Sequence, residues 1–206
     1  MKLLKLTLLI VVLLFSNIAF SANFDIESYT LDNGLTVILN HDISQNKVMG
    51  AVMVKAGSVN DPADATGMAH YFEHLIFNGT TNVGTVNWEA EKVHYNKIID
   101  LYEQLHSNPD SPDRDAILKQ INEESKAQAK YYQTKEQVSL LESIGARGIN
   151  AGTSKDRTIF HSYFPACQSE AWLKIYANQF QNPVFRNFQA ELETVYEEYN
   201  MYAEGS

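Results

Sequence analysis

The chain of 206 residues lacks the features that define several common classes of protein. It has one cysteine, Cys167, so an intrachain disulfide framework is excluded. It also lacks an excess of basic residues, because 16 Lys and Arg against 25 Asp and Glu give a formal net charge of −9. No Lys/Arg cluster forms the basic stripe that nucleic-acid binding requires, so we expect no nucleic-acid partner. Hydrophobic residues make up 45% of the chain, which is enough for a sizeable core and excludes general disorder.

The N-terminus has the pattern of a secretory signal peptide over residues 1–21. Two lysines precede an apolar run from Leu6 to Phe15, and Ala19-Phe20-Ser21 offers small side chains at both positions recognised for cleavage. The run is shorter than the ~20 apolar residues of a transmembrane helix. We therefore expect a periplasmic or secreted protein with no membrane span after signal cleavage. An uncleaved N-terminal anchor is the alternative.

The remaining residues, 22–206, alternate between strand and helix patterns. Asn33-Gly34 between two short β-rich runs predicts a hairpin with a tight turn. Strands are predicted at 28–31, 35–39, 48–54 and within 145–164, and helices at 67–77, 87–105, 111–132, 169–180 and 188–202. The fold class is therefore α+β, with an antiparallel sheet covered by helices. The two helices within about 87–132 form a helical hairpin that is polar enough to be a projecting insertion.

One cluster has the residue types and the spacing of a metal site: His70-Tyr71-Phe72-Glu73-His74. Histidines four residues apart in a helix share one face and can take two positions around a tetrahedral Zn²⁺. Glu73 borders that face, so it can act as a base on a metal-bound water without being a ligand. The H-x-x-E-H pattern is a known zinc motif, and it favours a hydrolytic site. The alternative is a helix with two half-buried, hydrogen-bonded histidines.

A third protein ligand is expected among the carboxylates between Glu191 and Glu198. Glu191, Val195 and Glu198 are spaced i, i+4 and i+7, so they form one stripe that faces inward. Glu193 and Glu197 lie off that stripe and are expected to be solvated. Inward carboxylates are costly unless positive charge meets them, which a metal ion would supply. The alternative is an acidic surface helix.

Together these motifs resemble the inverzincin metallopeptidases, the family of pitrilysin, insulin-degrading enzyme and the mitochondrial processing peptidase. The segment from Gly67 to Thr80 is similar to the family's first metal-binding motif, and Gly148 to Thr153 to its Asn-Ala-x-Thr edge strand. Glu191 to Glu198 resembles its distal E-x₆-E element. The similarity covers residues 26–203. It identifies residues 22–206 as the N-terminal peptidase domain of a bacterial secreted member, with the family's half-domain fold.

The resemblance implies roles for the residues at the matching positions. His70, His74 and Glu198 would bind one Zn²⁺ per chain. Glu73 would be the catalytic general base. Glu191 would be a second carboxylate that supports the metal ligands without binding the metal itself.

The same resemblance places Asn150 and Ala151 on the strand that pairs with an extended peptide substrate. The implied function is a zinc-dependent endopeptidase that hydrolyses peptides or unfolded polypeptides through a metal-activated water. Family members usually have a matching second half, and this sequence stops at Ser206. The resemblance therefore predicts a truncated chain that works with a second homologous domain or subunit. The alternative is a metal-binding but catalytically silent fragment or subunit that needs a partner half.

Overall fold

The computed structural model describes residues 25–204, with side chains as far as Met201. The predicted signal peptide at 1–21 lies outside this range. The chain divides into two compact units at Gln45, and each unit has its own sheet. Within residues 25–204, no helix combines the length and the apolar character needed to cross a membrane.

The first unit is the predicted hairpin. Strands β1 (Asp25–Thr30) and β2 (Thr36–His41) pair antiparallel. The Gly34 N–H donates to the Leu31 carbonyl, and the Leu31 N–H donates to the Leu35 carbonyl. Three residues, 32–34, therefore form the connection between the strands, as the predicted strand bounds of 28–31 and 35–39 require. Gly34 closes it with φ +86°, whereas Asn33 keeps a negative φ because only the last residue of such a loop needs the left-handed region.

The second unit is built on a three-stranded antiparallel sheet of order β3-β5-β4. Its strands are β3 (Lys47–Val54), β5 (Thr158–Pro165) and β4 (Arg147–Thr153). Alternate residues of the central strand β5 are buried, from Thr158 to Phe164. Strand β4 has a hydrogen-bonded neighbour on one side only within the described part of the chain.

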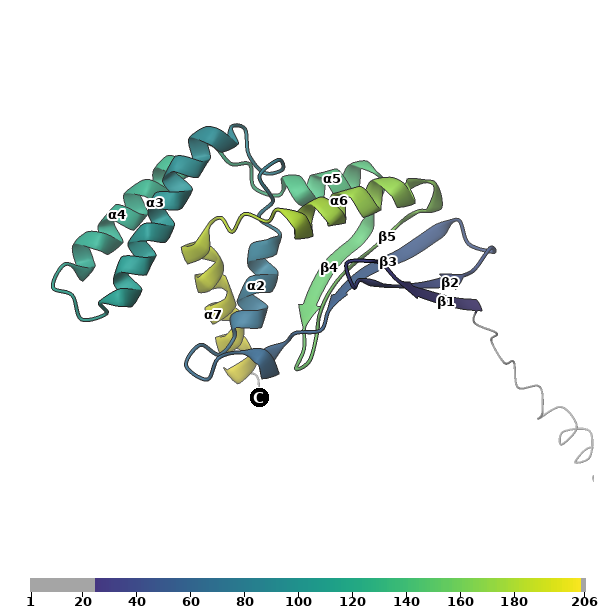
Figure 1. Cartoon of the computed structure of the whole chain (residues 1–206), viewed down its shortest axis with the longest axis horizontal. Helices are drawn as coiled ribbons and strands as arrows, with labels where there is room; N and C mark the ends of the chain where they lie inside the picture. The colour runs from purple at the N-terminus through teal and green to yellow at the C-terminus, as the bar shows by residue number, and fades with distance from the viewer. Residues whose placement is uncertain (1–24, 205–206) are drawn as a thin grey trace, which may run out of the picture. The chain divides into compact units, whose positions relative to one another are not determined.

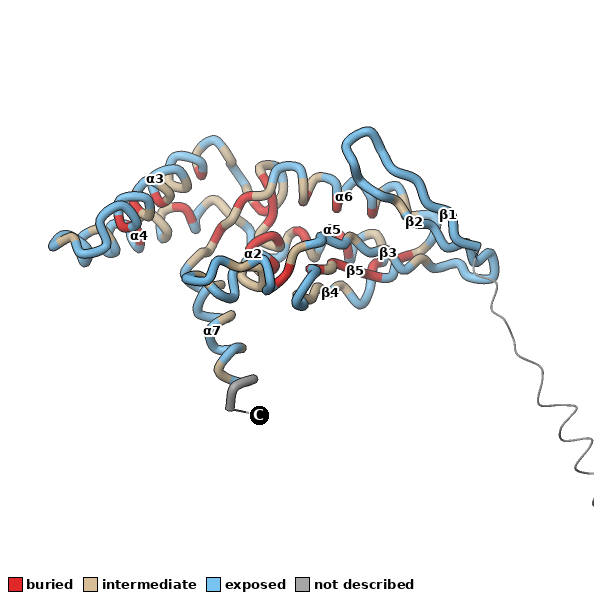
Figure 2. Tube along the Cα trace, turned by 60° about the horizontal axis from the view of Figure 1, so that its bottom comes forward, coloured by how far each residue is buried: buried red, intermediate tan, exposed pale blue. Residues whose placement is uncertain are grey.

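Helices α5 (Glu136–Ser143) and α6 (Ser169–Gln181) cover one face of this sheet, as Figure 1 shows. The core lies between these two layers and contains buried residues of α5, α6 and β5, which appear red in Figure 2. Trp172 of α6 stacks on Phe164 of β5, and both lie against Gly50, where a Cβ atom would come within 2.7 Å of each ring. The prediction of an antiparallel sheet covered by helices is confirmed.

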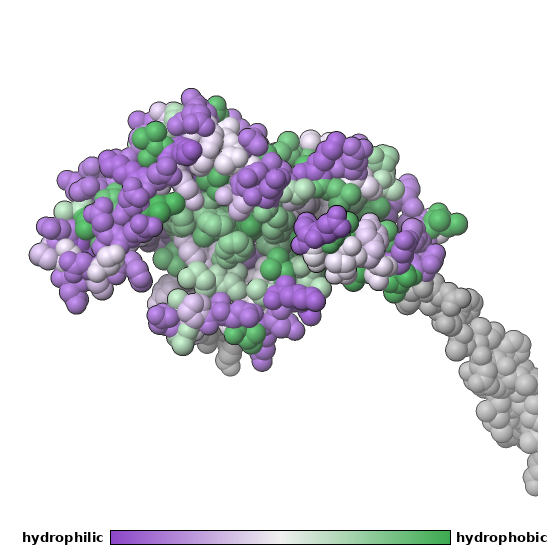
Figure 3. All heavy atoms as spheres, in the orientation of Figure 1, coloured by the Kyte–Doolittle hydropathy of each residue, from purple (hydrophilic) through white to green (hydrophobic). Residues whose placement is uncertain are grey.

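Helices α3 (Trp88–Ser107) and α4 (Arg114–Gln128) form the predicted helical hairpin. Figure 3 shows that its surface is mainly hydrophilic. Its own small apolar cluster contains Ile98, Leu101, Leu105 and Ile121. A β-bridge between Thr85 and Tyr132 brings the two ends of the hairpin together.

Two boundaries of the hairpin helices differ from the sequence prediction. Helix α4 begins at Arg114, not at the predicted Ser111-Pro112 start, because the Ser111 hydroxyl accepts the Asp113 N–H in a separate turn. The helix ends at Gln128, not near 132, because the Tyr131 carbonyl accepts the Val86 N–H at the base of the hairpin.

The remaining elements connect this framework to the candidate site. Helix α2 (Met68–Ile76) lies beside α7 (Phe188–Glu204), and short 3₁₀ helices occupy Ser58–Asn60 and Ala166–Gln168. Helix α5 has no counterpart in the sequence prediction, because two turns carry too little hydrophobic periodicity to stand out.

Candidate functional site

Helix α2 presents two histidines on one face. Asp61 caps its N-terminus, because the two carboxylate oxygens accept the N–H groups of Gly67 and Ala69, each at 2.8 Å. This cap fixes where the helix begins and therefore which residues share a face. One turn further on, the Nε2 atoms of His70 and His74 lie 3.3 Å apart.

Helix α7 brings Glu198 to the same place. Its Oε2 atom lies 3.4 Å from Nε2 of His70 and 3.6 Å from Nε2 of His74. One ligand atom from each of the three residues lies within 4.8 Å of the other two. A tetrahedral zinc ion with bonds of about 2.0–2.2 Å separates its ligand atoms by about 3.3–3.6 Å. The three residues therefore form a candidate metal-ligand cluster, because their ligand atoms have the spacing that such an ion requires.

Glu191 holds the ring of His74 from the other side. Its Oε2 atom lies 3.3 Å from Nδ1 of His74, so a proton on Nδ1 leaves Nε2 free to bind a metal. This hydrogen bond is the main cause that raises the pKa of His74 and lowers the pKa of Glu191 from their ordinary values. A second hydrogen bond, from Asn78, also lowers the pKa of Glu191.

Glu73 lies beside the metal-ligand cluster and is 8% exposed. Its Oε2 atom accepts a 2.6 Å hydrogen bond from the Thr153 hydroxyl of strand β4. The Thr158 hydroxyl lies 3.3 Å from that of Thr153 and donates to the Ala56 carbonyl. The carboxylate of Glu73 is therefore held by the sheet, not by the two histidines of its own helix.

The candidate metal ligands and Glu73 line a common cleft of about 1440 Å³. All seven predicted site residues line it: His70, Glu73, His74, Asn150, Ala151, Glu191 and Glu198. The edge strand β4 forms one wall, which places a backbone available for strand pairing next to the metal-ligand cluster.

The glutamate stripe of α7 has the burial that its spacing predicts. Glu191, Val195 and Glu198 are partly buried, whereas Glu193 and Glu197 are exposed. The sequence analysis assigned no role to three residues that the structure connects to this site. Thr153 bonds to Glu73, and its place at the end of the Asn-Ala-x-Thr motif was a signal that could have found it. Asn78 bonds to Glu191, and Arg186 bonds to Asn78; a lone Asn or Arg carries no metal or catalytic signature, so only the contacts identify them.

Comparison with known proteins agrees with this geometry. The family model described as Insulinase (Peptidase family M16) matches residues 36–95, a range that contains both histidines and Glu73. Residues 36–95 thus resemble peptidase family M16. A curated relative, coenzyme PQQ synthesis protein F of Pseudomonas syringae pv. tomato, is 43% identical over 56 residues. That match covers 27% of the chain and 7% of the relative.

Solved structures support the fold over a longer part of the chain. A protease from Helicobacter pylori matches with a TM-score of 0.60 at 20% identity, over 89% of this chain and 32% of that one. The first half of the periplasmic protease PqqL from Escherichia coli matches with a TM-score of 0.55 at 19% identity, over 85% and 29% respectively. The chain thus spans about a third of the Helicobacter pylori protease and about a third of the first half of PqqL.

Proposed function

We propose that the chain is the zinc-binding domain of a metalloendopeptidase that hydrolyses peptides or unfolded polypeptides. The main support for this proposal is that His70, His74 and Glu198 line one cleft together with Glu73, beside the edge strand β4. The match of residues 36–95 to peptidase family M16 supports a peptidase-type function. The ligand set of two imidazoles and one carboxylate is typical of catalytic zinc sites with an open position.

The chain's own residues account for the steps of amide hydrolysis. Zinc bound by His70, His74 and Glu198 would lower the pKa of a water toward ~7 and polarise the scissile carbonyl. Glu73 takes the proton of the attacking water and passes it to the leaving amine. A peptide in extended conformation pairs with β4 at Asn150 and Ala151, which places its backbone along the cleft.

We further propose that a second homologous domain or subunit completes the active site, and that the protein is periplasmic or secreted. The chain corresponds to 32% of the protease from Helicobacter pylori and to 29% of the first half of PqqL, so both of these proteases are longer. One of them is described as periplasmic, which agrees with the predicted signal peptide.

Zinc content and peptide hydrolysis, measured on the same preparation, test this proposal. We expect one zinc per chain, and its loss when His70 and His74 are both changed to Ala. Full zinc retention by that double variant would refute the metal site. Stoichiometric zinc without hydrolysis, even with a homologous second half added, would favour the alternative of a metal-binding but silent subunit.

Two glutamate variants separate the base from the ligand. Glu73→Gln keeps the size of the side chain but cannot take the water proton, so zinc should stay bound while kcat of the enzyme completed by its second half falls by roughly 10²-fold or more. Without that second half we expect little hydrolysis from any variant, so zinc binding is the deciding measurement. Glu198→Gln should weaken zinc affinity, because a neutral amide is a poorer ligand than a carboxylate. Glu197→Gln, a change at the exposed neighbour, is the matched control and should alter neither. Zinc loss in Glu73→Gln with retention in Glu198→Gln would reverse the two assignments.

A further inference from the structure

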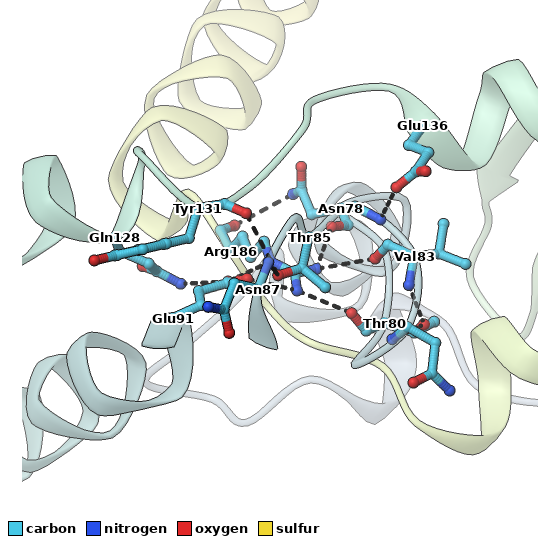
Figure 4. A network of polar contacts seen from close by, with 12 residues as sticks. Asn78, Thr80, Val83, Thr85, Asn87, Glu91, Gln128, Tyr131, Glu136 and Arg186 are labelled. Carbon is cyan, nitrogen blue, oxygen red and sulfur yellow. Dashed lines mark hydrogen bonds and ion pairs between the residues drawn. The ribbon is translucent and has the colours of Figure 1, made fainter. Parts of the chain in front are cut away.

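A buried arginine links the base of the helical hairpin to the loop that follows α2. Arg186 is 1% exposed and forms an ion pair with Glu91 of α3, which is 0% exposed (Figure 4). Its other guanidinium hydrogens go to the backbone of the loop, with bonds of 2.8 Å to the Asn78 carbonyl and 2.9 Å to the Thr80 carbonyl. This loop folds tightly around the guanidinium, because a Cβ atom on Gly79 would lie 2.4 Å from the Val83 carbonyl oxygen.

Asn78 is bonded to Arg186 at both its backbone and its side chain. Its carbonyl accepts from the guanidinium, and its side-chain amide donates to the Arg186 carbonyl at 3.3 Å. The same amide donates to Oε1 of Glu191, also at 3.3 Å. The other oxygen of Glu191 faces Nδ1 of His74. A continuous chain of polar contacts therefore runs from the buried ion pair to the metal-ligand cluster.

Each oxygen of the Glu191 carboxylate therefore has its own hydrogen-bond partner. Asn78 holds Oε1, which leaves Oε2 directed at His74 and fixes the plane of the carboxylate. Hydrogen-bonded partners of a metal-binding histidine fix its tautomer and ring orientation and raise its strength as a ligand. An unheld Glu191 could rotate away from Nδ1 of His74, since its side chain is 21% exposed.

We propose that Asn78 is a positioning residue for the metal centre, and that the buried Arg186–Glu91 pair holds Asn78 in place. The inference rests on the proposed function, because it requires that His74 bind a metal. It makes the helical hairpin part of the support of the metal centre, since Glu91 belongs to α3.

Zinc and cobalt titrations of the full chain test this inference. Asn78→Leu keeps the approximate size and removes the donor to Glu191. We expect it to weaken Zn²⁺ binding by roughly 10-fold, the lower end of the range for outer partners of metal ligands. The absorption spectrum of bound Co²⁺ should change as well, because the orientation of His74 is less fixed. Gln128→Met is the control, since Gln128 bonds to Glu91 but not to Asn78 or Glu191. It should lower the melting temperature of the metal-free chain and leave zinc affinity unchanged.

A second variant keeps the test decisive if Asn78→Leu does not fold. In Glu91→Leu with Arg186→Met, apolar side chains replace the whole ion pair, a change that buried pairs often tolerate. Zinc binding should weaken here too, because the Asn78 carbonyl has lost its donor. Wild-type zinc affinity and an unchanged Co²⁺ spectrum in Asn78→Leu, or in the double variant, would overturn the inference. Equal loss of affinity in Gln128→Met would also overturn it, by showing a general effect of stability. A wild-type chain that binds no zinc would instead refute the proposed function, and the inference with it.

Discussion

Replacing Glu91 by Gln should destabilise the fold more than almost any other change of a single charge. The substitution keeps the shape of the side chain and an oxygen that can accept from Gln128 and from Nε of Arg186. It removes the negative charge of the carboxylate. In the wild-type chain Nη2 of Arg186 donates to Oε2 of Glu91 at 3.1 Å, whereas in the variant Nη2 would face an NH₂ group. The positive charge of Arg186 then stays buried without its partner.

The burial of both side chains sets the size of the effect. Glu91 is 0% exposed and Arg186 is 1% exposed, so water cannot replace the lost charge. Removing one partner of a buried ion pair costs about 3–5 kcal/mol. In a domain of 150–250 residues, 1 kcal/mol lowers the melting temperature by about 2–4 °C, so Glu91→Gln should lower it by about 6–20 °C.

Thermal or urea unfolding of the metal-free chain measures this loss. Glu89→Gln is a matched control, because Glu89 is an exposed carboxylate in the same first turn of α3. Its interaction with the helix dipole is worth about 0.3–1 kcal/mol. A loss below about 1 kcal/mol in Glu91→Gln, similar to that of the control, would refute the reasoning by showing that water reaches Arg186.

Two further predictions concern the hairpin itself. Deleting residues 93–126 and joining the ends by a short turn keeps Glu91, the buried partner of Arg186, and Gln128, which bonds to Glu91, so folding and zinc content should survive. A failure to fold would show that the hairpin belongs to the core. Glu124 accepts hydrogen bonds from His94, at 2.7 Å, and from Lys97, and these lower its pKa from the ordinary value of 4.5. The stabilisation is present above pH 4.5 and is lost as the pH falls through the lower folded-state pKa, so Glu124→Gln should lose stability at pH 7 and converge with wild type at an acid pH below that pKa. Melting curves with equal separation at both pH values would contradict this.

Much of the candidate site follows from short-range spacing in the sequence. A spacing of four positions places His70 and His74 on one helical face, and the spacing of Glu191, Val195 and Glu198 predicts the stripe that is partly buried in α7. Such predictions succeed because helical periodicity is a local property. The same reasoning predicts the strands of the central sheet, whose alternating residues face the core.

The burial of Glu91 and its ion pair could not be predicted from the neighbouring sequence. The sequence places it in the first turn of α3, where any acidic residue is favoured by the helix dipole. Only the tertiary structure shows that it is fully buried against Arg186, 95 residues further along the chain. Periodicity in the sequence predicts which residues share a face of one helix or strand. The partner of a buried charge depends instead on how separate helices and strands pack together. The position of Asn78 between Arg186 and Glu191 was decided in the same way.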